Sequence, residues 1–197
     1  MKIFGAVFLS FFAALLVLTG CKTSRKASES APYRLKLRDG NFELRDYADL
    51  TVVETGMGSD SGSSFQRLFR YISGGNAAGE KIPMTTPVFM AGRESDRSMS
   101  FVMPATMKSV PMPTDRAVRV ATIPAGRFAV FQFSGARSTQ GEVEALEKLK
   151  AWMKSRQFAG SENPVFGYFD PPWTPSFLRR NEVMLRLDGR EAIRKIE

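Results

Sequence analysis

The sequence contains no histidine, and its 197 residues include a single cysteine, Cys21. Histidine is the commonest general base, the commonest metal ligand and the usual axial ligand of haem iron, so the chain cannot build sites of that kind. A lone cysteine has no disulfide partner within the chain. It is also too little for zinc or iron–sulfur sites, which need several thiolate or histidine ligands.

The motifs of common enzyme sites are missing as well. The chain has no Gly-x-Ser-x-Gly nucleophile elbow and no Walker phosphate loop. Glycines between Gly56 and Gly62 match no phosphate fingerprint and indicate a surface loop, although the helix N-terminus after them could hold an anion. The carboxylates of Glu142 and Glu144 fall on a predicted helix surface, which indicates solvated side chains. We therefore expect a protein that is not an enzyme, with neither catalytic residues nor a metal site.

The N-terminus is typical of an exported protein. Lys2 precedes an almost unbroken apolar run from Ile3 to Leu18, which predicts a signal peptide over residues 1–20. The run is short for a membrane-spanning helix. Leu-Thr-Gly-Cys, ending at Cys21, resembles the lipobox of bacterial lipoproteins, in which the cysteine thiol receives a diacylglyceryl group and the new amino group is acylated. The alternative is an ordinary signal peptide followed by a chance cysteine.

A lipidated Cys21 would be followed by a flexible tether. Residues 21–32 are rich in Ser, Lys and Ala and show no apolar periodicity. Several acyl chains on one residue exceed the two signals that stable anchoring needs. The residue after the cysteine is Lys22 rather than Asp, which by resemblance to Gram-negative lipoproteins implies an outer-membrane protein facing the periplasm.

The net charge of +8 raises the question of an anionic partner. Basic residues are scattered along the chain rather than gathered on one predicted helix, and an exported protein meets little nucleic acid. We therefore expect no nucleic-acid partner. Attraction to anionic lipid head groups or to a small anionic ligand accounts for the charge more simply.

Residues 33–197 are expected to form one domain of strands and two helices. Phe65, Leu68, Phe69 and Ile72 form the apolar stripe of the first helix, capped by Ser63 or Ser64. The second helix is expected to start with a capping box, Thr139 and Glu142, and to carry the stripe Val143, Leu146, Leu149 and Met153. Alternating or β-rich segments predict strands at 33–39, 42–47, 50–57, 98–103, 118–123, 128–133, 165–169 and 182–187.

The order of these elements repeats. Strand, turn, strand, polar loop, amphipathic helix and strand occur in the first half and again from Val118 to Phe169. A duplicated unit with antiparallel pairing predicts the α+β class, with one distorted, barrel-like antiparallel sheet of two pseudo-repeated halves flanked by two helices.

One apolar region stands out in the middle of the chain. In the stretch Lys81–Phe89, prolines on both sides of Met84-Thr85-Thr86 stiffen the chain and lead into a strand at Val88. Methionine adapts its shape and suits loosely specified binding surfaces, but it also fills cores. The region contains Met84, Met90, Met99, Met103, Met107 and Met112.

Four motifs, in order and spacing, resemble the SOUL haem-binding protein family. They are Glu43–Tyr47, Phe65–Asn76, Lys81–Val88, and Pro171–Trp173 with Arg179–Val183. The resemblance covers about Tyr33 to Leu187. It implies a distorted β-barrel of duplicated halves with two helices, and the binding of haem or another tetrapyrrole, through an axial histidine or in an apolar groove without one.

Because the histidine is absent, the resemblance implies a ligand held in an apolar groove. The residues expected to bind it are Phe65, Leu68, Phe69, Arg70, Ile72 and Met84. Arg70 or Arg67 would meet the propionates, and a Met or Tyr would be a weak ligand. We expect a lipid-anchored, non-catalytic protein that binds haem or a similar apolar anion; the alternatives are an envelope interaction module without a small ligand, and an enzyme acting on a tetrapyrrole.

Overall fold

The structure is a computed structural model that describes residues 29–58, 60–92 and 96–188. The predicted signal peptide, Cys21 and most of the predicted tether lie outside these ranges. Within them, no helix combines the length and the apolar character that crossing a membrane requires.

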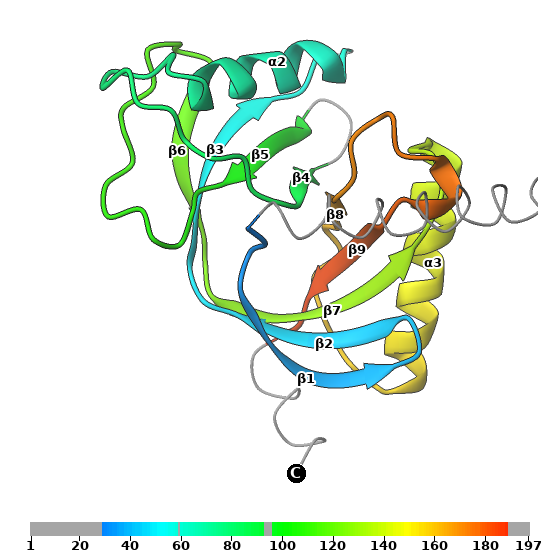
Figure 1. The fold of residues 1–197 in the computed structure, drawn as a ribbon. Helices are drawn as coiled ribbons and strands as arrows, with labels where there is room; N and C mark the ends of the chain where they lie inside the picture. Colours follow the sequence, from blue (N-terminus) through cyan, green and yellow to red (C-terminus); the bar gives the residue numbers. More distant parts are fainter. Residues whose placement is uncertain (1–28, 59, 93–95, 189–197) are drawn as a thin grey trace, which may run out of the picture.

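The predicted strands and helices are confirmed in type and order (Figure 1). Short loops join most of them, and a one-turn 3-10 helix, η2, precedes the last strand. The elements are β1 (Tyr33–Asp39), β2 (Phe42–Tyr47), β3 (Leu50–Gly56), α2 (Ser61–Ile72), β4 (Val88–Ala91), β5 (Ser98–Val102), β6 (Val118–Ile123), β7 (Gly126–Phe133), α3 (Thr139–Ser155), β8 (Val165–Tyr168), η2 (Ser176–Leu178) and β9 (Asn181–Arg186).

All nine strands form one antiparallel sheet in the order β1-β2-β7-β9-β8-β4-β5-β3-β6. Each strand of the first half has an equivalent in the second half: β2 corresponds to β6, β3 to β7, β4 to β8 and β5 to β9. If every strand from β2 to β6 in this order is replaced by its equivalent, the same order results, read in the opposite direction. The helices follow the same correspondence, since α2 packs on β3 and β5 while α3 packs on β7 and β9. The predicted duplicated unit is therefore confirmed, with β1 as an addition at one edge.

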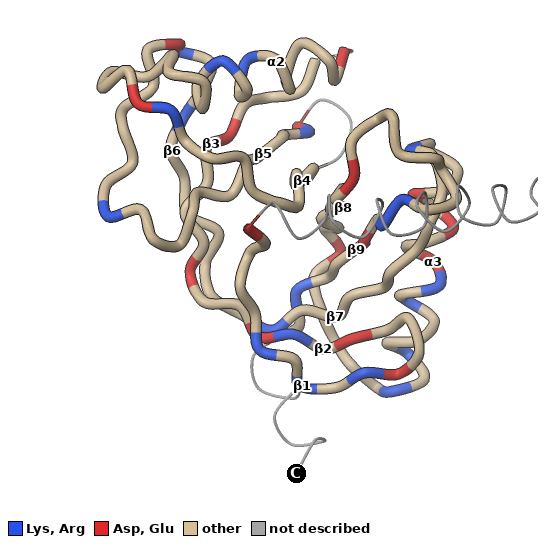
Figure 2. The backbone as a smooth tube through the Cα atoms, in the orientation of Figure 1, with Lys and Arg blue, Asp and Glu red and all other residues tan. Residues whose placement is uncertain are grey.

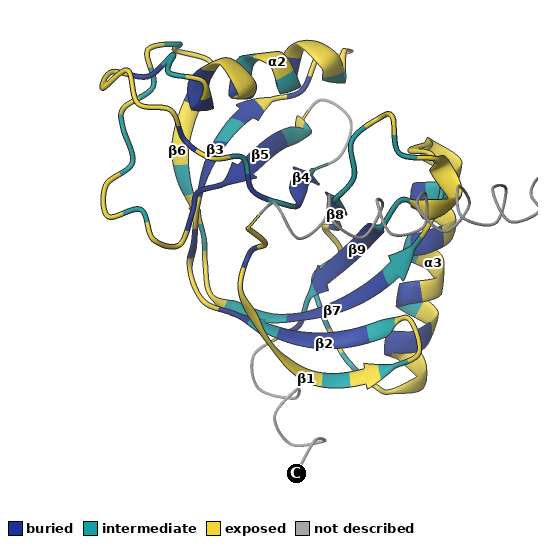
Figure 3. Ribbon diagram, viewed as in Figure 1, coloured by how far each residue is buried: buried dark blue, intermediate teal, exposed yellow. Residues whose placement is uncertain are grey.

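The sheet curls into a half-barrel in which both faces of the inner strands are buried, whereas the edge strands β1 and β6 are largely exposed (Figures 1 and 3). Its outer face carries one apolar cluster beneath each helix, around Leu149 of α3 and around Leu68 of α2. Its inner face carries a third cluster to which nearly every strand contributes. All the buried members of the three clusters lie between Ala31 and Leu187, so this part of the chain contains its own core.

Several methionines of the central region belong to that core. Met90, Met99 and Met103 are buried beneath α2, which confirms the core-filling interpretation for these three. Met84 and Met107 are partly buried against the same cluster. Met112 differs, because 69% of it is exposed.

The start of α3 corrects two predictions. Ser138, not Thr139, is the N-cap, and its hydroxyl accepts a hydrogen bond from the Gly141 amide at 3.1 Å. The buried face of α3 is also centred differently from the predicted stripe: Val143 is 50% exposed, while Ala145 and Trp152 join Leu149 and Met153 in the core.

The Lys81–Phe89 stretch connects three parts of the fold. The Ile82 amide donates to the Ile72 carbonyl at the end of α2, 2.8 Å away. Its Thr85 hydroxyl donates to the Val102 carbonyl of β5 at 2.6 Å. Thr86 exchanges backbone hydrogen bonds with Glu29 and Ala31, at 2.8 and 3.0 Å. These contacts of Glu29 and Ala31 join the residues just before Tyr33 to the Lys81–Phe89 stretch.

A buried ion cluster crosses β2, β7 and β9 on the inner face of the sheet. The Arg45 guanidinium is fully buried and donates to Glu43 at 2.6 Å and to both carboxylate oxygens of Glu182 at 2.7 and 2.9 Å. It also lies 4.2 Å from the centre of the Tyr33 ring. No buried side-chain nitrogen or oxygen in the described ranges lacks a hydrogen-bond partner. The cluster therefore holds β9 and β2 in register across β7.

Removing the cation from this cluster should be strongly destabilising. The variant Arg45→Met removes the only fully buried cation of the cluster and leaves the buried carboxylates of Glu43 and Glu182 with only the partly exposed Arg38 and Arg180, so we expect the free energy of unfolding to fall by about 3–5 kcal/mol. Arg38→Met is the control: Arg38 pairs with the same Glu43, but 61% of its side chain is exposed, and we expect a loss below about 1 kcal/mol. Urea unfolding followed by circular dichroism measures both. Equal losses in the two variants would contradict this role of the buried cluster.

Candidate functional site

Helix α2, which carries most of the predicted site, begins one turn earlier than its predicted cap. Asp60 is the N-cap, and its carboxylate accepts hydrogen bonds from the amides of Gly62 at 2.8 Å and Ser63 at 3.1 Å. The prediction of Ser63 or Ser64 as the cap was wrong. Asp caps a helix as well as Ser does, and Asp60 comes first in the chain, so the helix begins directly after it. Ser64 is instead buried against β3, where its hydroxyl donates to the Gly56 carbonyl.

The predicted binding residues of α2 do not share one surface. Leu68 and Ile72 point into the core and are 0% and 4% exposed. Phe65 is half-buried, packs edge-on against Phe101 of β5 and stacks on Phe69, whose exposed fraction is 43%. The structure thus brings Phe65, Leu68, Ile72 and Met84 into or against one cluster and leaves Phe69 outside it.

The basic residues of α2 lie on its other flank. At 100° per residue, Arg67 and Phe69 are about 160° apart around the helix axis. Accordingly, Phe65 faces β5, whereas the Arg67 guanidinium donates to the Thr55 hydroxyl of β3 at 2.8 Å. The aromatic flank therefore faces the middle of the sheet, and the basic flank faces its β6 edge.

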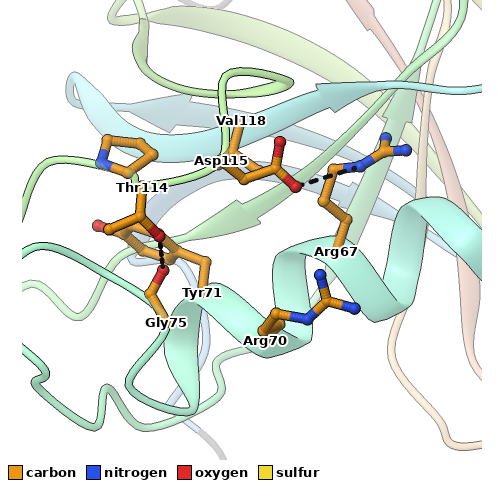
Figure 4. Close-up of a pocket in the computed structure, with 8 residues that line it drawn as sticks. Arg67, Arg70, Tyr71, Gly75, Thr114, Asp115 and Val118 are labelled. Atoms are coloured by element: carbon orange, nitrogen blue, oxygen red, sulfur yellow. Dashed lines mark hydrogen bonds and ion pairs between the residues drawn. The ribbon is translucent and has the colours of Figure 1, made fainter.

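A hollow of about 270 Å³ lies beside this basic flank, between α2 and the loop before β6 (Figure 4). Arg67 faces Asp115 across it, with 3.7 Å between the Nε atom and the carboxylate. The Thr114 hydroxyl ties the loop to the Gly75 carbonyl at 2.8 Å. A side chain at Gly75 would meet the Arg70 carbonyl at 2.8 Å, so the turn requires glycine there. The lining residues are Arg67, Arg70, Tyr71, Gly75, Pro113, Thr114, Asp115 and Val118.

The hollow has a positive bias. Asp115 offsets part of the charge of Arg67, while Arg70 is exposed and has no carboxylate partner among the described residues. Tyr71 forms the floor, and its hydroxyl donates to the Pro111 carbonyl at 2.6 Å. Burial raises the pKa of Tyr71, and the negative charge of Glu80 adds to the effect, so the phenol stays protonated. The site can accept an anionic group at Arg70 but offers no phenolate.

No cluster of carboxylate, cysteine or histidine side chains in the described ranges could hold a metal ion. Basic and acidic residues alternate over both halves of the fold, as predicted, rather than forming one basic face (Figure 2).

A second polar cluster joins the beginnings of the two helices and corrects the interpretation of Glu142. This residue is 6% exposed rather than solvated. It accepts hydrogen bonds from the Tyr168 hydroxyl at 2.6 Å, from Arg97 at 2.6 Å and from Arg137 at 3.3 Å. Arg137 also donates to Ser61 of α2 at 3.0 Å. Burial raises the pKa of Tyr168 well above its usual range, and the hydrogen bond to Glu142 adds to the shift, so the phenol stays protonated. Because Glu142 is paired with all three of these donors, the cluster is a structural contact.

Sequence reasoning found Arg70 and Arg67 but missed the loop side of the hollow. Thr114 and Asp115 come from a segment without apolar periodicity, so no pattern places them against α2. Tyr71 was not predicted as a site residue because it falls outside the predicted apolar stripe of the helix, which was Phe65, Leu68, Phe69 and Ile72.

Comparisons with known proteins agree with this fold. The sequence profile of the SOUL heme-binding protein family matches residues 28–186. No curated protein sequence matches the chain significantly.

Solved structures resemble the chain in fold alone, because their sequence identities are low. The EcmrR C-terminal domain has a TM-score of 0.58 at 13% identity, covering 80% of this chain and 98% of that one. EcmrR in a DNA complex has a TM-score of 0.56 at 12% identity, and the match covers 94% of this chain and 69% of that one. A hydrolase from Listeria innocua has a TM-score of 0.56 at 9% identity, and the match covers 77% of this chain and 94% of that one. The duplicated half-barrel and the profile match across nearly the whole described domain show that the chain belongs to the SOUL heme-binding protein family.

Proposed function

We propose that this domain binds a tetrapyrrole without transforming it, and that the carboxylates of the ligand meet the basic flank of α2. The observation that carries the proposal is the hollow beside that flank, where the Arg70 guanidinium is exposed and lacks a carboxylate partner among the described residues. A guanidinium pairs with a carboxylate through two parallel hydrogen bonds, which gives direction as well as attraction. Haem-like tetrapyrroles carry such carboxylates on one edge.

The hollow suits part of such a ligand. Pockets that enclose a drug-sized molecule measure about 300–1,000 Å³, so a cavity of about 270 Å³ takes one edge of a large planar ring. The rest of the ring would lie over the outer face of α2 toward Phe69, which is 43% exposed. Leu68 and Ile72 support this face from below rather than touching the ligand.

The residues present fit a tetrapyrrole better than they fit its iron. The chain has no histidine, Tyr71 is protonated and engaged with Pro111, and Met84 is partly buried. Bound haem would supply redox chemistry at its iron, while the chain itself would hold the carboxylates and cover one ring face. Met84 packs against the cluster beneath α2 and does not line the hollow, so it does not supply the weak Met or Tyr ligand suggested by the sequence to a ring bound there.

We also propose that the protein is held at the outer membrane, facing the periplasm, by lipid on Cys21. The lipobox-like Leu18–Cys21 segment supports this proposal, because it ends at the only cysteine in the chain. The backbone contacts of Glu29 and Ala31 with Thr86 bind the chain to the domain eight residues after Cys21. The domain would then stay close to the bilayer.

Arg70→Ala should weaken hemin binding by at least about tenfold, because a charge-assisted hydrogen bond is worth about 1.5–3 kcal/mol. The measurement is a Soret titration of the chain from Lys22 to Glu197, which contains the whole core. Arg34→Ala is the matched control, since it removes an exposed arginine from β1, at the opposite edge of the sheet from β6. No saturable Soret change for the unaltered chain would refute haem binding, and equal affinity of both variants would place the ligand elsewhere.

Cys21→Ala should abolish lipid attachment. Cells expressing the full chain are labelled with radioactive palmitate, and the label is expected on the unaltered protein and absent from the variant. Because the chain has no second cysteine, the variant removes the one possible thiol acceptor. Label that persists in Cys21→Ala would refute the lipoprotein assignment.

A further inference from the structure

The loop between β8 and β9 presents large apolar side chains to solvent. Trp173 is 83% exposed, Phe177 75% and Leu178 38%. Pro171, Pro172 and Pro175 lie among them, and the loop passes close to the start of α3 (Figure 1). A large apolar side chain exposed singly needs no explanation, whereas three on one short loop indicate an interaction site.

The loop is built to hold these side chains outward. The Arg179 guanidinium donates to the Thr174 carbonyl at 2.8 Å and also to the Pro172 carbonyl, which closes the loop on itself. Within it, the amides of Thr174 and Leu178 donate to the carbonyls of Pro171 and Pro175 at 3.0 and 2.9 Å.

The base of the loop is tied to the neighbouring segment. The Gly135 amide donates to the Ser176 carbonyl at 3.1 Å, and the Asn181 side chain donates to the Gly135 carbonyl at 3.0 Å. The exposed rings are therefore presented by an ordered frame, and ordering them would cost little when they bind.

The charge around the loop identifies the partner. The loop, residues 169–180, contains Arg179, Arg180 and one acidic residue, Asp170, whose carboxylate lies at the base of the loop and accepts a hydrogen bond from the Arg180 amide at 2.6 Å. Arg180 pairs with Glu182, but Arg179 meets backbone carbonyls and no carboxylate among the described residues. Exposed Trp, Phe and Leu beside a cation are typical of segments that enter the interfacial layer of a bilayer containing anionic lipid.

We propose that Trp173, Phe177 and Leu178 insert into the interface of an anionic membrane and orient the domain on it. This surface lies outside the proposed ligand hollow and does not depend on ligand. One supporting argument rests on the proposed lipid anchor: Cys21 lies eight residues before Glu29, so an extended tether would span at most about 26–29 Å. That reach would keep the loop at high local concentration near the bilayer.

The two tryptophans of the chain provide the test. Trp152 is buried, donates to Asp39 at 2.9 Å and stacks on Phe42, so its emission should not respond to lipid. Trp173 should shift to shorter wavelength when the unlipidated chain from Lys22 to Glu197 meets vesicles of phosphatidylcholine with phosphatidylglycerol. Brominated phosphatidylcholine in those vesicles should quench the same emission.

Phe177→Ser should lower the vesicle partition coefficient by at least about tenfold, because burying a phenyl side chain is worth about 1.5–3 kcal/mol. Met112→Ser is the matched control, since it removes a 69% exposed apolar side chain from another loop and should leave partitioning unchanged. Thermal unfolding confirms that both variants fold.

Three results would overturn the proposal: no spectral shift with anionic vesicles, equal losses in Phe177→Ser and Met112→Ser, or dimerisation in solution that Phe177→Ser abolishes. The last would assign the surface to a second copy of the chain. The chain from Lys22 to Glu197 used with vesicles lacks Cys21, so its failure to bind them would leave the palmitate test of the anchor unaffected.

Discussion

The fold depends on burying both faces of the strands that lie between the exposed edge strands β1 and β6. Apolar side chains alternate to both sides of the central strands, as Val52 and Val53 do in β3, where they belong to different clusters. Each half covers its outer face with one helix, and the curl of the sheet lets the inner faces pack against each other. Because the halves are related by exchange of their strands, each helix meets the equivalent pair of strands. The Arg45 cluster is the charged exception on the inner face, and it is tolerated because both neighbouring carboxylates pair with it.

That constraint decides where a ligand can bind. The inner stripe of α2 is used to cover the sheet, so Leu68 and Ile72 are committed to the core. What remains of the helix is its outer face and its two flanks, one aromatic and one basic. The loop before β6 packs against the basic flank and forms the hollow, which places Arg67 and Arg70 where carboxylates can reach them. We propose that a ligand is recognised there through its charge and its ring surface, which accords with a chain that has no histidine.

Periodicity and turn signals predicted the strands, both helices and the duplicated halves, because these depend on local patterns. The sequence could not predict contacts made across the fold. Glu142 was predicted to be a surface residue because it falls outside the apolar stripe of α3, and its partners Arg97 and Tyr168 are distant in sequence. Asp115 came from a loop without a pattern. Met99 and Met103 illustrate the same limit, since composition alone does not separate a core from a binding surface.

The central claim is that the carboxylates and the ring, rather than the iron, are recognised. It is tested most directly by comparing dissociation constants of hemin, metal-free protoporphyrin and protoporphyrin dimethyl ester for the chain from Lys22 to Glu197. The first two should bind within about threefold of each other, because no strong axial ligand is available. The ester should bind at least about tenfold more weakly, because it cannot pair with arginine. Binding of hemin without binding of the metal-free ring, or undiminished binding of the ester, would contradict the account.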